Sequence, residues 1–130
     1  MGSSSAVQSV DEKVRRSKAF PRAYSLLINA AEQKQVVTYG ELANIMGLPP
    51  TGNHTGNMVG IMLGLITESE HDGNRPMLSA VAVSSTHQMP GTGFYGLAEQ
   101  YGLLSSDAST EEKRTFWRTQ RDLVYEEWSR

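Results

Sequence analysis

Few side chains in this 130-residue chain are of types that carry out acid–base or metal chemistry near neutral pH. Cysteine is absent, which excludes disulfides, thiolate catalysis and cysteine-ligated zinc or iron–sulfur clusters. The remaining candidates for metal binding or proton transfer are His54, His71, His87, Glu70 and Asp72. Their spacing matches no known ligand signature, and the three histidines fall in expected loops or at a helix start. The sequence therefore predicts no metal, no cofactor and no catalytic residue, and it leans against an enzyme.

Two other patterns are too incomplete to predict a reaction. Ser84-Ser85-Thr86 precedes His87, but no carboxylate nearby in the sequence would orient that histidine for nucleophilic catalysis. The turn Gly91-Thr92-Gly93 is shorter than a phosphate-binding loop and lacks the lysine that follows such a loop. A binding protein is a better interpretation than an enzyme.

The charges are unevenly distributed along the chain, although the net charge is only −2. Residues 11–22 carry two acids and five basic residues, which are Lys13, Arg15, Arg16, Lys18 and Arg22. Residues 23–104 carry only Lys34 and Arg75 against six acids. The basic stretch is either a phosphate-binding element or an ordinary solvated helix face, and the acidic middle does not attract nucleic acid.

The hydrophobic fraction of 38% is sufficient for the core of one domain. We expect a disordered leader over residues 1–10 and a single domain over residues 11–130. No apolar run approaches the length of a membrane span, and no apolar segment typical of a signal peptide follows the start. Together with the missing cysteines, these features favour a cytoplasmic protein.

The apolar spacing predicts three helices in the first half of the chain and one at the end. The first helix runs from the basic stretch to about Glu32, and the last starts at Ser109 or Thr110 and includes Trp128. Between them, Thr38 and Glu41 form a capping box that starts a short helix ending at Gly47. A further helix is expected over residues 55–68. Two strands, residues 77–83 and 94–95, are expected to pair as an antiparallel hairpin.

Three glycines recur at every fourth position of the helix expected over residues 55–68. They are Gly56, Gly60 and Gly64, which lie on nearly one face of that helix. Each costs the helix about 1 kcal/mol relative to alanine, so their spacing requires a reason. We expect this face to pack against another backbone of the same chain, and a dimer interface is the alternative.

The order of these elements predicts an α/β fold of the winged helix-turn-helix type: three helices, a small antiparallel hairpin and a long C-terminal helix. Within this order, Val37-Thr38-Tyr39-Gly40-Glu41-Leu42-Ala43 and the segment 57–63 resemble the DNA-binding domain of alkylguanine-DNA alkyltransferases and alkyltransferase-like proteins. Asn74-Arg75-Pro76 and Gly93-Phe94-Tyr95-Gly96 are similar to the turn and the wing of that family. The resemblance covers residues 37–96, about half of the chain.

The resemblance implies binding to double-stranded DNA without alkyl transfer. A gap-free alignment from Pro76 places Val81 where the family has its reactive cysteine, so no thiolate can accept an alkyl group. Tyr39 matches a tyrosine that contacts a phosphate, and Asn57 matches an arginine that enters the base stack. The resemblance thus implies a scaffold without the repair chemistry.

Two functions are consistent with these observations. In the first, the protein binds double-stranded DNA without catalysis: Arg15, Arg16 and Lys18 anchor the phosphates, while Asn53, Thr55 and Asn57 reach base edges beside Tyr39. In the second, the same fold is a small cytoplasmic protein–protein interaction or accessory module, for example in a phage or an anti-phage system. Residues 51–68 carry no lysine or arginine, so affinity for DNA would depend on cations elsewhere in the chain.

Overall fold

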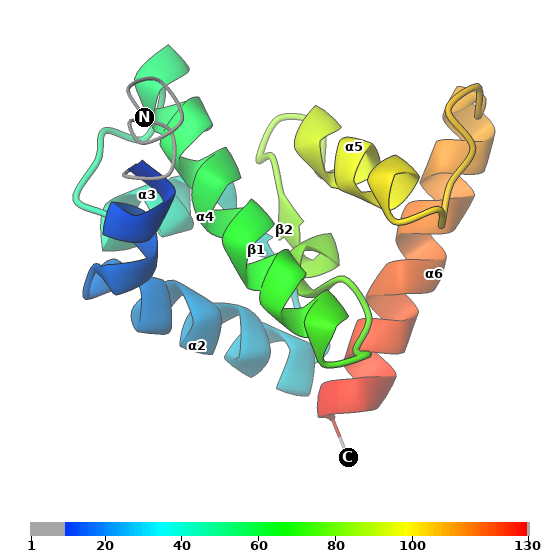
Figure 1. Cartoon of the computed structure of the whole chain (residues 1–130), viewed down its shortest axis with the longest axis horizontal. Helices are drawn as coiled ribbons and strands as arrows, with labels where there is room; N and C mark the ends of the chain where they lie inside the picture. The colour runs from blue at the N-terminus through cyan, green and yellow to red at the C-terminus, as the bar shows by residue number, and fades with distance from the viewer. Residues whose placement is uncertain (1–9, 130) are drawn as a thin grey trace, which may run out of the picture.

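The computed structural model describes residues 10–129 and is mostly helical, with one small parallel sheet (Figure 1). Residues 10–16 are helical, and most of the predicted leader lies outside the described residues. The following elements are α2 (Ala19–Glu32), β1 (Val37–Thr38), α3 (Tyr39–Ile45), α4 (Asn53–Asp72), the 3-10 helix η1 (Leu78–Val81), β2 (Ala82–Val83), α5 (Thr92–Gln100) and α6 (Thr110–Trp128). In the described part of the chain, no helix is long and apolar enough to cross a membrane.

A short buried segment, residues 77–83, forms the centre of the fold. Every residue in it is at most 4% exposed, and α2, α4 and α6 all pack against its 3-10 helix. Ser79, Ala80 and Ala82 have small side chains, which lets these helices approach the segment closely. At its end, β2 pairs with β1 in parallel, with Val37 opposite Ala82 and Thr38 opposite Val83.

Side chains from the surrounding helices satisfy polar groups of the central segment that this two-residue strand pair leaves unpaired. The Met77 N–H donates to Gln120 Oε1 at 3.1 Å, and Trp117 Nε1–H donates to the Ala80 carbonyl at 2.8 Å. The Thr67 hydroxyl donates to Ser79 Oγ at 2.6 Å. Because an unpaired polar group is costly in a buried position, these bonds fix how α4 and α6 sit on the segment.

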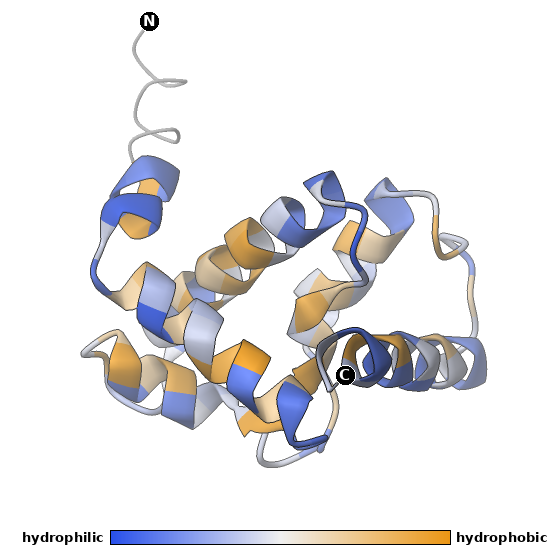
Figure 2. Cartoon of the chain, turned by 90° about the horizontal axis from the view of Figure 1, so that it is seen from below, coloured by the Kyte–Doolittle hydropathy of each residue, from blue (hydrophilic) through white to orange (hydrophobic). Residues whose placement is uncertain are grey.

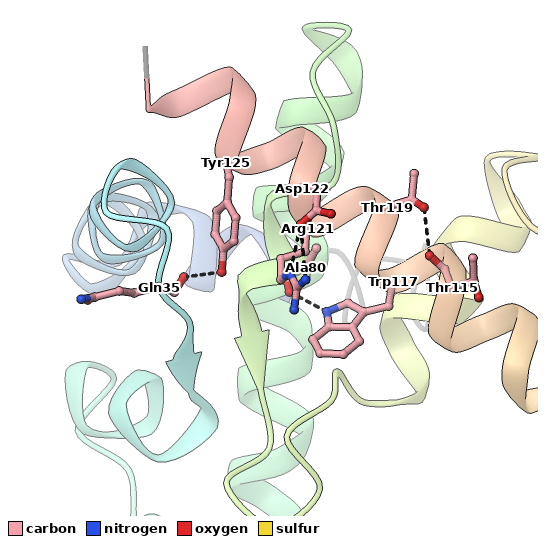
Figure 3. A network of polar contacts seen from close by, with 8 residues as sticks. All are labelled: Gln35, Ala80, Thr115, Trp117, Thr119, Arg121, Asp122 and Tyr125. Carbon is pink, nitrogen blue, oxygen red and sulfur yellow. Dashed lines mark hydrogen bonds and ion pairs between the residues drawn. The ribbon is translucent and has the colours of Figure 1, made fainter.

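Helix α6 is amphipathic, with blue and orange segments alternating along it in Figure 2. Ser109 and Glu112 form a capping box at its start, so the predicted cap is confirmed. Figure 3 shows how α6 is attached: beside the Trp117 bond to Ala80, the Tyr125 hydroxyl donates to the Gln35 carbonyl at 3.1 Å. The guanidinium of Arg121 lies 5.2 Å from the ring centre of Trp117 and 5.9 Å from that of Tyr125.

A buried carboxylate connects α2 to the end of α4. Glu70 is 1% exposed, and its Oε2 accepts hydrogen bonds from the Tyr24 hydroxyl and from both Nε and NH2 of Arg75, the latter at 3.1 and 2.9 Å. Its other oxygen, Oε1, has no hydrogen-bond partner. Burial of the hydroxyl and its bond to Glu70 raise the pKa of Tyr24, and the Glu70 bond raises the pKa of Arg75. The guanidinium of Arg75 therefore supplies the opposite charge beside this buried carboxylate.

The predicted helices are largely confirmed, whereas the predicted hairpin is wrong. Thr38 caps α3, since its Oγ1 accepts from the Glu41 N–H at 3.2 Å, which is one of the two bonds of the expected capping box; Gly47 takes the left-handed φ of +70°. The expected strand over residues 77–83 is mainly the 3-10 helix, and residues 94–95 belong to α5. Within residues 10–129, the two strands are parallel and lie far apart in sequence. The fold class is thus correct only as a mixed α and β fold, and the winged helix is not confirmed.

Replacing Arg75 with alanine should reduce the free energy of unfolding by about 2–4 kcal/mol, because it leaves the Glu70 carboxylate buried without its cation. Urea denaturation measures the change. The matched control is Arg15→Ala: Arg15 pairs with Glu68 at 3.3 Å, but both side chains are more than half exposed, so its loss should cost less than about 1 kcal/mol. Equal effects of the two substitutions would show that the buried pair does not stabilise the fold.

Candidate functional site

The glycine face of α4 does not pack against another backbone, which corrects the expectation drawn from its spacing. A Cβ atom built on Gly56, Gly60 or Gly64 would meet no atom within 4 Å beyond the helix itself and the chain neighbours. The opposite face of α4 supplies the core, with Met62 and Ile66 fully buried. The missing side chains therefore leave space open on one side of the helix.

This space is a groove between α4 and α5 with a volume of about 420 Å³. We call it the α4–α5 groove. The three glycines form part of its wall, and its other α4 and α5 residues include Val59, Leu63, Phe94 and Leu97. Its size and its mostly apolar wall are typical of binding sites in proteins.

One end of the α4–α5 groove has a polar wall formed by Tyr39 and the start of α5. The Gly91 N–H donates to the Tyr39 hydroxyl, which leaves the phenolic proton able to donate in turn. A Cβ on Gly91 would lie 3.1 Å from Tyr39 Oη, so glycine permits this close approach. Burial raises the pKa of Tyr39, and the phenol is neutral at physiological pH.

The groove continues along α4 beyond this first hollow. A second hollow, of about 250 Å³, shares Gly64 and Leu97 with the first and extends to Asp11, Glu68 and Gln100. From Gly56 to Glu68 the helix rises by about 18 Å. Residues near the start of α4 thus face the start of α5, and residues near the end of α4 face its end, so the two helices run in the same direction (Figure 1).

The two ends of the groove differ in electrostatic character. Neither α4 nor α5 has an acidic residue in its first turn or a side-chain cap, so their N–H groups make the Tyr39 end positive. The other end collects both helix C-termini together with Glu68 and Asp11. The His71 ring stacks on Tyr101 at 3.8 Å and joins the two helix ends there.

The residues predicted to contact DNA do not gather at one place. Arg15 lies beside Glu68 near the end of α4, about 22 Å along the helix from Asn53 at its start. Arg16 pairs with Glu12 at 3.5 Å, and Lys18 is exposed just before α2.

Of the predicted base-contacting side chains, Asn53 and Asn57 are exposed, whereas Thr55 is 4% exposed and points into the protein. Tyr39 lies in the wall of the α4–α5 groove.

No group of three or more histidine, aspartate or glutamate side chains in residues 10–129 is placed to hold a metal ion. Glu70, one of the candidate acid–base residues, is instead part of the buried pair with Arg75.

Sequence reasoning found the glycines but missed the residues opposite them. The sequence predicts a strand over residues 94–95 instead of a helix, and it does not predict that Phe94 and Leu97 line a site. The spacing of Phe94, Ala98 and Tyr101, at i, i+4 and i+7, was the signal that indicated a helix. Residues 91–96 also contain three glycines, and two glycine-rich segments near each other in the fold would leave open space between them.

Replacing Gly60 with alanine should raise the free energy of unfolding by about 0.5–1 kcal/mol, because alanine favours the helix and its Cβ enters open space. Gly56→Ala should behave in the same way. The control is Gly47→Ala, which should destabilise the protein, since Gly47 has a φ of +70°. Chemical denaturation measures all three, and a loss of stability in Gly60→Ala would mean that this face is packed after all.

The stability of the protein should fall as the pH rises above about 10. Burial is the largest cause of a raised pKa for all five tyrosines, which are Tyr24, Tyr39, Tyr95, Tyr101 and Tyr125. The unfolded chain therefore releases phenolic protons first. The raised tyrosine pKa values stabilise the folded protein fully at a pH below the ordinary tyrosine pKa. This stabilisation is lost as the pH rises from the ordinary tyrosine pKa through the higher pKa values of the folded protein. Urea denaturation between about pH 8 and pH 11 tests this, and Tyr39→Phe should reduce the loss.

Comparison with known proteins yields no relative from which a function could be transferred. No family model, no curated protein and no solved structure matches the chain. The function must be argued from the groove and the charges around it.

Proposed function

We propose that this protein is a non-catalytic protein-interaction module that binds an apolar helical segment of a polypeptide in the α4–α5 groove. The observation that carries the proposal is the open glycine face of α4, where three consecutive helical turns expose backbone to a recess with an apolar wall. Glycine in a helix interior has a stability cost, so open space at all three positions favours a role in contact with another molecule.

The shape of the groove favours a polypeptide over a compact ligand. It comprises two hollows that share Gly64 and Leu97, and it follows α4 for about 18 Å. A helix of about 12 residues has this length, and apolar residues at helical spacing would contact Val59, Leu63 and Leu97. Glycine at the contact allows the two helix backbones to approach closely.

Charge favours a protein partner over DNA. The surface of α3 and α4 has no lysine or arginine, because none occurs between Lys34 and Arg75. Two cations that lie beside α4, Arg15 and Arg75, are both paired with glutamates of that helix. Since phosphate neutralisation supplies most of the affinity for DNA, DNA binding remains a prediction with little electrostatic support.

The experiment selects helix-forming peptides from a displayed library on the wild-type protein and measures their affinity by fluorescence anisotropy. The informative variant is Gly60→Leu, which fills the groove. The matched control is Gly96→Leu, since Gly96 is also an exposed helical glycine with open space around it but lies outside the groove. Selected peptides should bind wild type and Gly96→Leu equally and Gly60→Leu at least about tenfold more weakly, a loss of about 1.4 kcal/mol.

Short DNA duplexes are titrated in parallel at low salt. Peptides that bind all three proteins alike would refute the groove as the site. Duplex binding that weakens in Asn57→Ala and not in Gly60→Leu would instead support the DNA-binding prediction.

A further inference from the structure

The groove has a feature that restricts what can fill it: the charges on α4 oppose the dipole of the helix. Its first turn has no acid and its cap, Gly52, makes no side-chain bond. Its last turns carry three acids, Glu68, Glu70 and Asp72, beside the basic residue His71, at the end where the helix dipole is already negative. Arg75 compensates the buried Glu70, but the Glu68 side chain is 55% exposed and shares only a surface ion pair with Arg15.

An antiparallel helix beside α4 would compensate the charge at both ends of α4. It would place the negative end of its dipole at the start of α4 and the positive end at Glu68. A second copy of α4 has the required distribution of charge. If a two-fold axis passes near Gly60, Glu68 of one copy lies level with Gly52 of the other, since each is eight residues from Gly60. Gly56 then faces Gly64 across the interface.

The apolar contacts of such a pair are also self-complementary. The glycine row leaves open space on the α4 surface, so two rows facing each other let the helix backbones approach closely. Leu63 and Leu97 in the groove wall of each copy would be covered by the other copy. A two-fold interface of this kind uses the same patch on both chains and closes without forming fibres.

From these observations we propose that the segment in the α4–α5 groove is α4 of a second copy of this chain, packed antiparallel about Gly60. This inference rests on the proposed function, and it names the partner of the same site. In this arrangement the glycine row and the charges of α4 lie in a single interface between two copies of the chain, so the protein is a homodimer.

Sedimentation equilibrium over protein concentrations up to about 1 mM tests the association. Wild type and Gly96→Leu should form dimers with the same Kd, and Gly60→Leu should raise that Kd at least about tenfold. Both variants add a leucine to open space on a helix, so neither should unfold, and their thermal denaturation confirms this. A wild-type protein that stays monomeric, or a Gly60→Leu protein that dimerises equally well, overturns the second copy as the partner.

Cross-linking tests the direction, because the natural chain has no cysteine. Gly56→Cys and Gly64→Cys are mixed, one of them labelled with heavy nitrogen, and oxidised with diamide. Antiparallel packing predicts mainly the mixed disulfide, whereas parallel packing predicts the two homodimers; mass spectrometry separates them. Gly96→Cys is the control for random collision. If the protein does not dimerise, the selection of helical peptides still tests independently whether the α4–α5 groove binds a polypeptide.

Discussion

The fold depends on the burial of one short stretch of backbone, residues 77–83. The short pairing of β2 with β1 and the 3-10 turn itself leave some polar groups of these seven buried residues unpaired, and the neighbouring helices bond to them. Gln120 and Trp117 supply the bonds from α6, and Thr67 supplies one from α4. The hydrogen bond from Thr67 to the central segment therefore helps to set the position of α4. Since α4 carries the glycine row, this bond also helps to set the location of the groove.

Local signals predicted the helices well. Thr38, Gly47 and Ser109 each act through neighbouring residues, and a cap or a left-handed turn needs no knowledge of the remaining fold. The central segment could not be assigned in this way. A run of small and apolar residues is compatible with a buried strand and with a buried 3-10 helix, and only the tertiary partners Gln120 and Trp117 decide between them.

Of the residues in the α4–α5 groove, the sequence singled out the three glycines of α4 but not the residues of α5 opposite them, and it did not predict an open groove. The spacing of Gly56, Gly60 and Gly64 placed them on one helix face, which the structure confirms. Whether that face meets backbone or open space depends on where α5 lies, and the sequence predicts a strand over residues 94–95, which belong to α5. The basic stretch was predictable as charge. Its Arg16–Glu12 pair is four residues apart and needs only a helix, whereas the Arg15–Glu68 pair required the fold.

The bonds from α6 to the central segment also constrain when the protein can fold. Gln120 lies 43 residues after Met77, and Trp117 lies 37 residues after Ala80. During synthesis, the Met77 N–H and the Ala80 carbonyl therefore have no α6 partner until the ribosome has added and released those later residues. Burial of the segment before then would leave unpaired polar groups in an apolar environment, so the earlier helices are expected to stay loosely packed. Completion of the core is thus a late event for a nascent chain, governed by the emergence of α6 rather than by the formation of α2, α3 and α4.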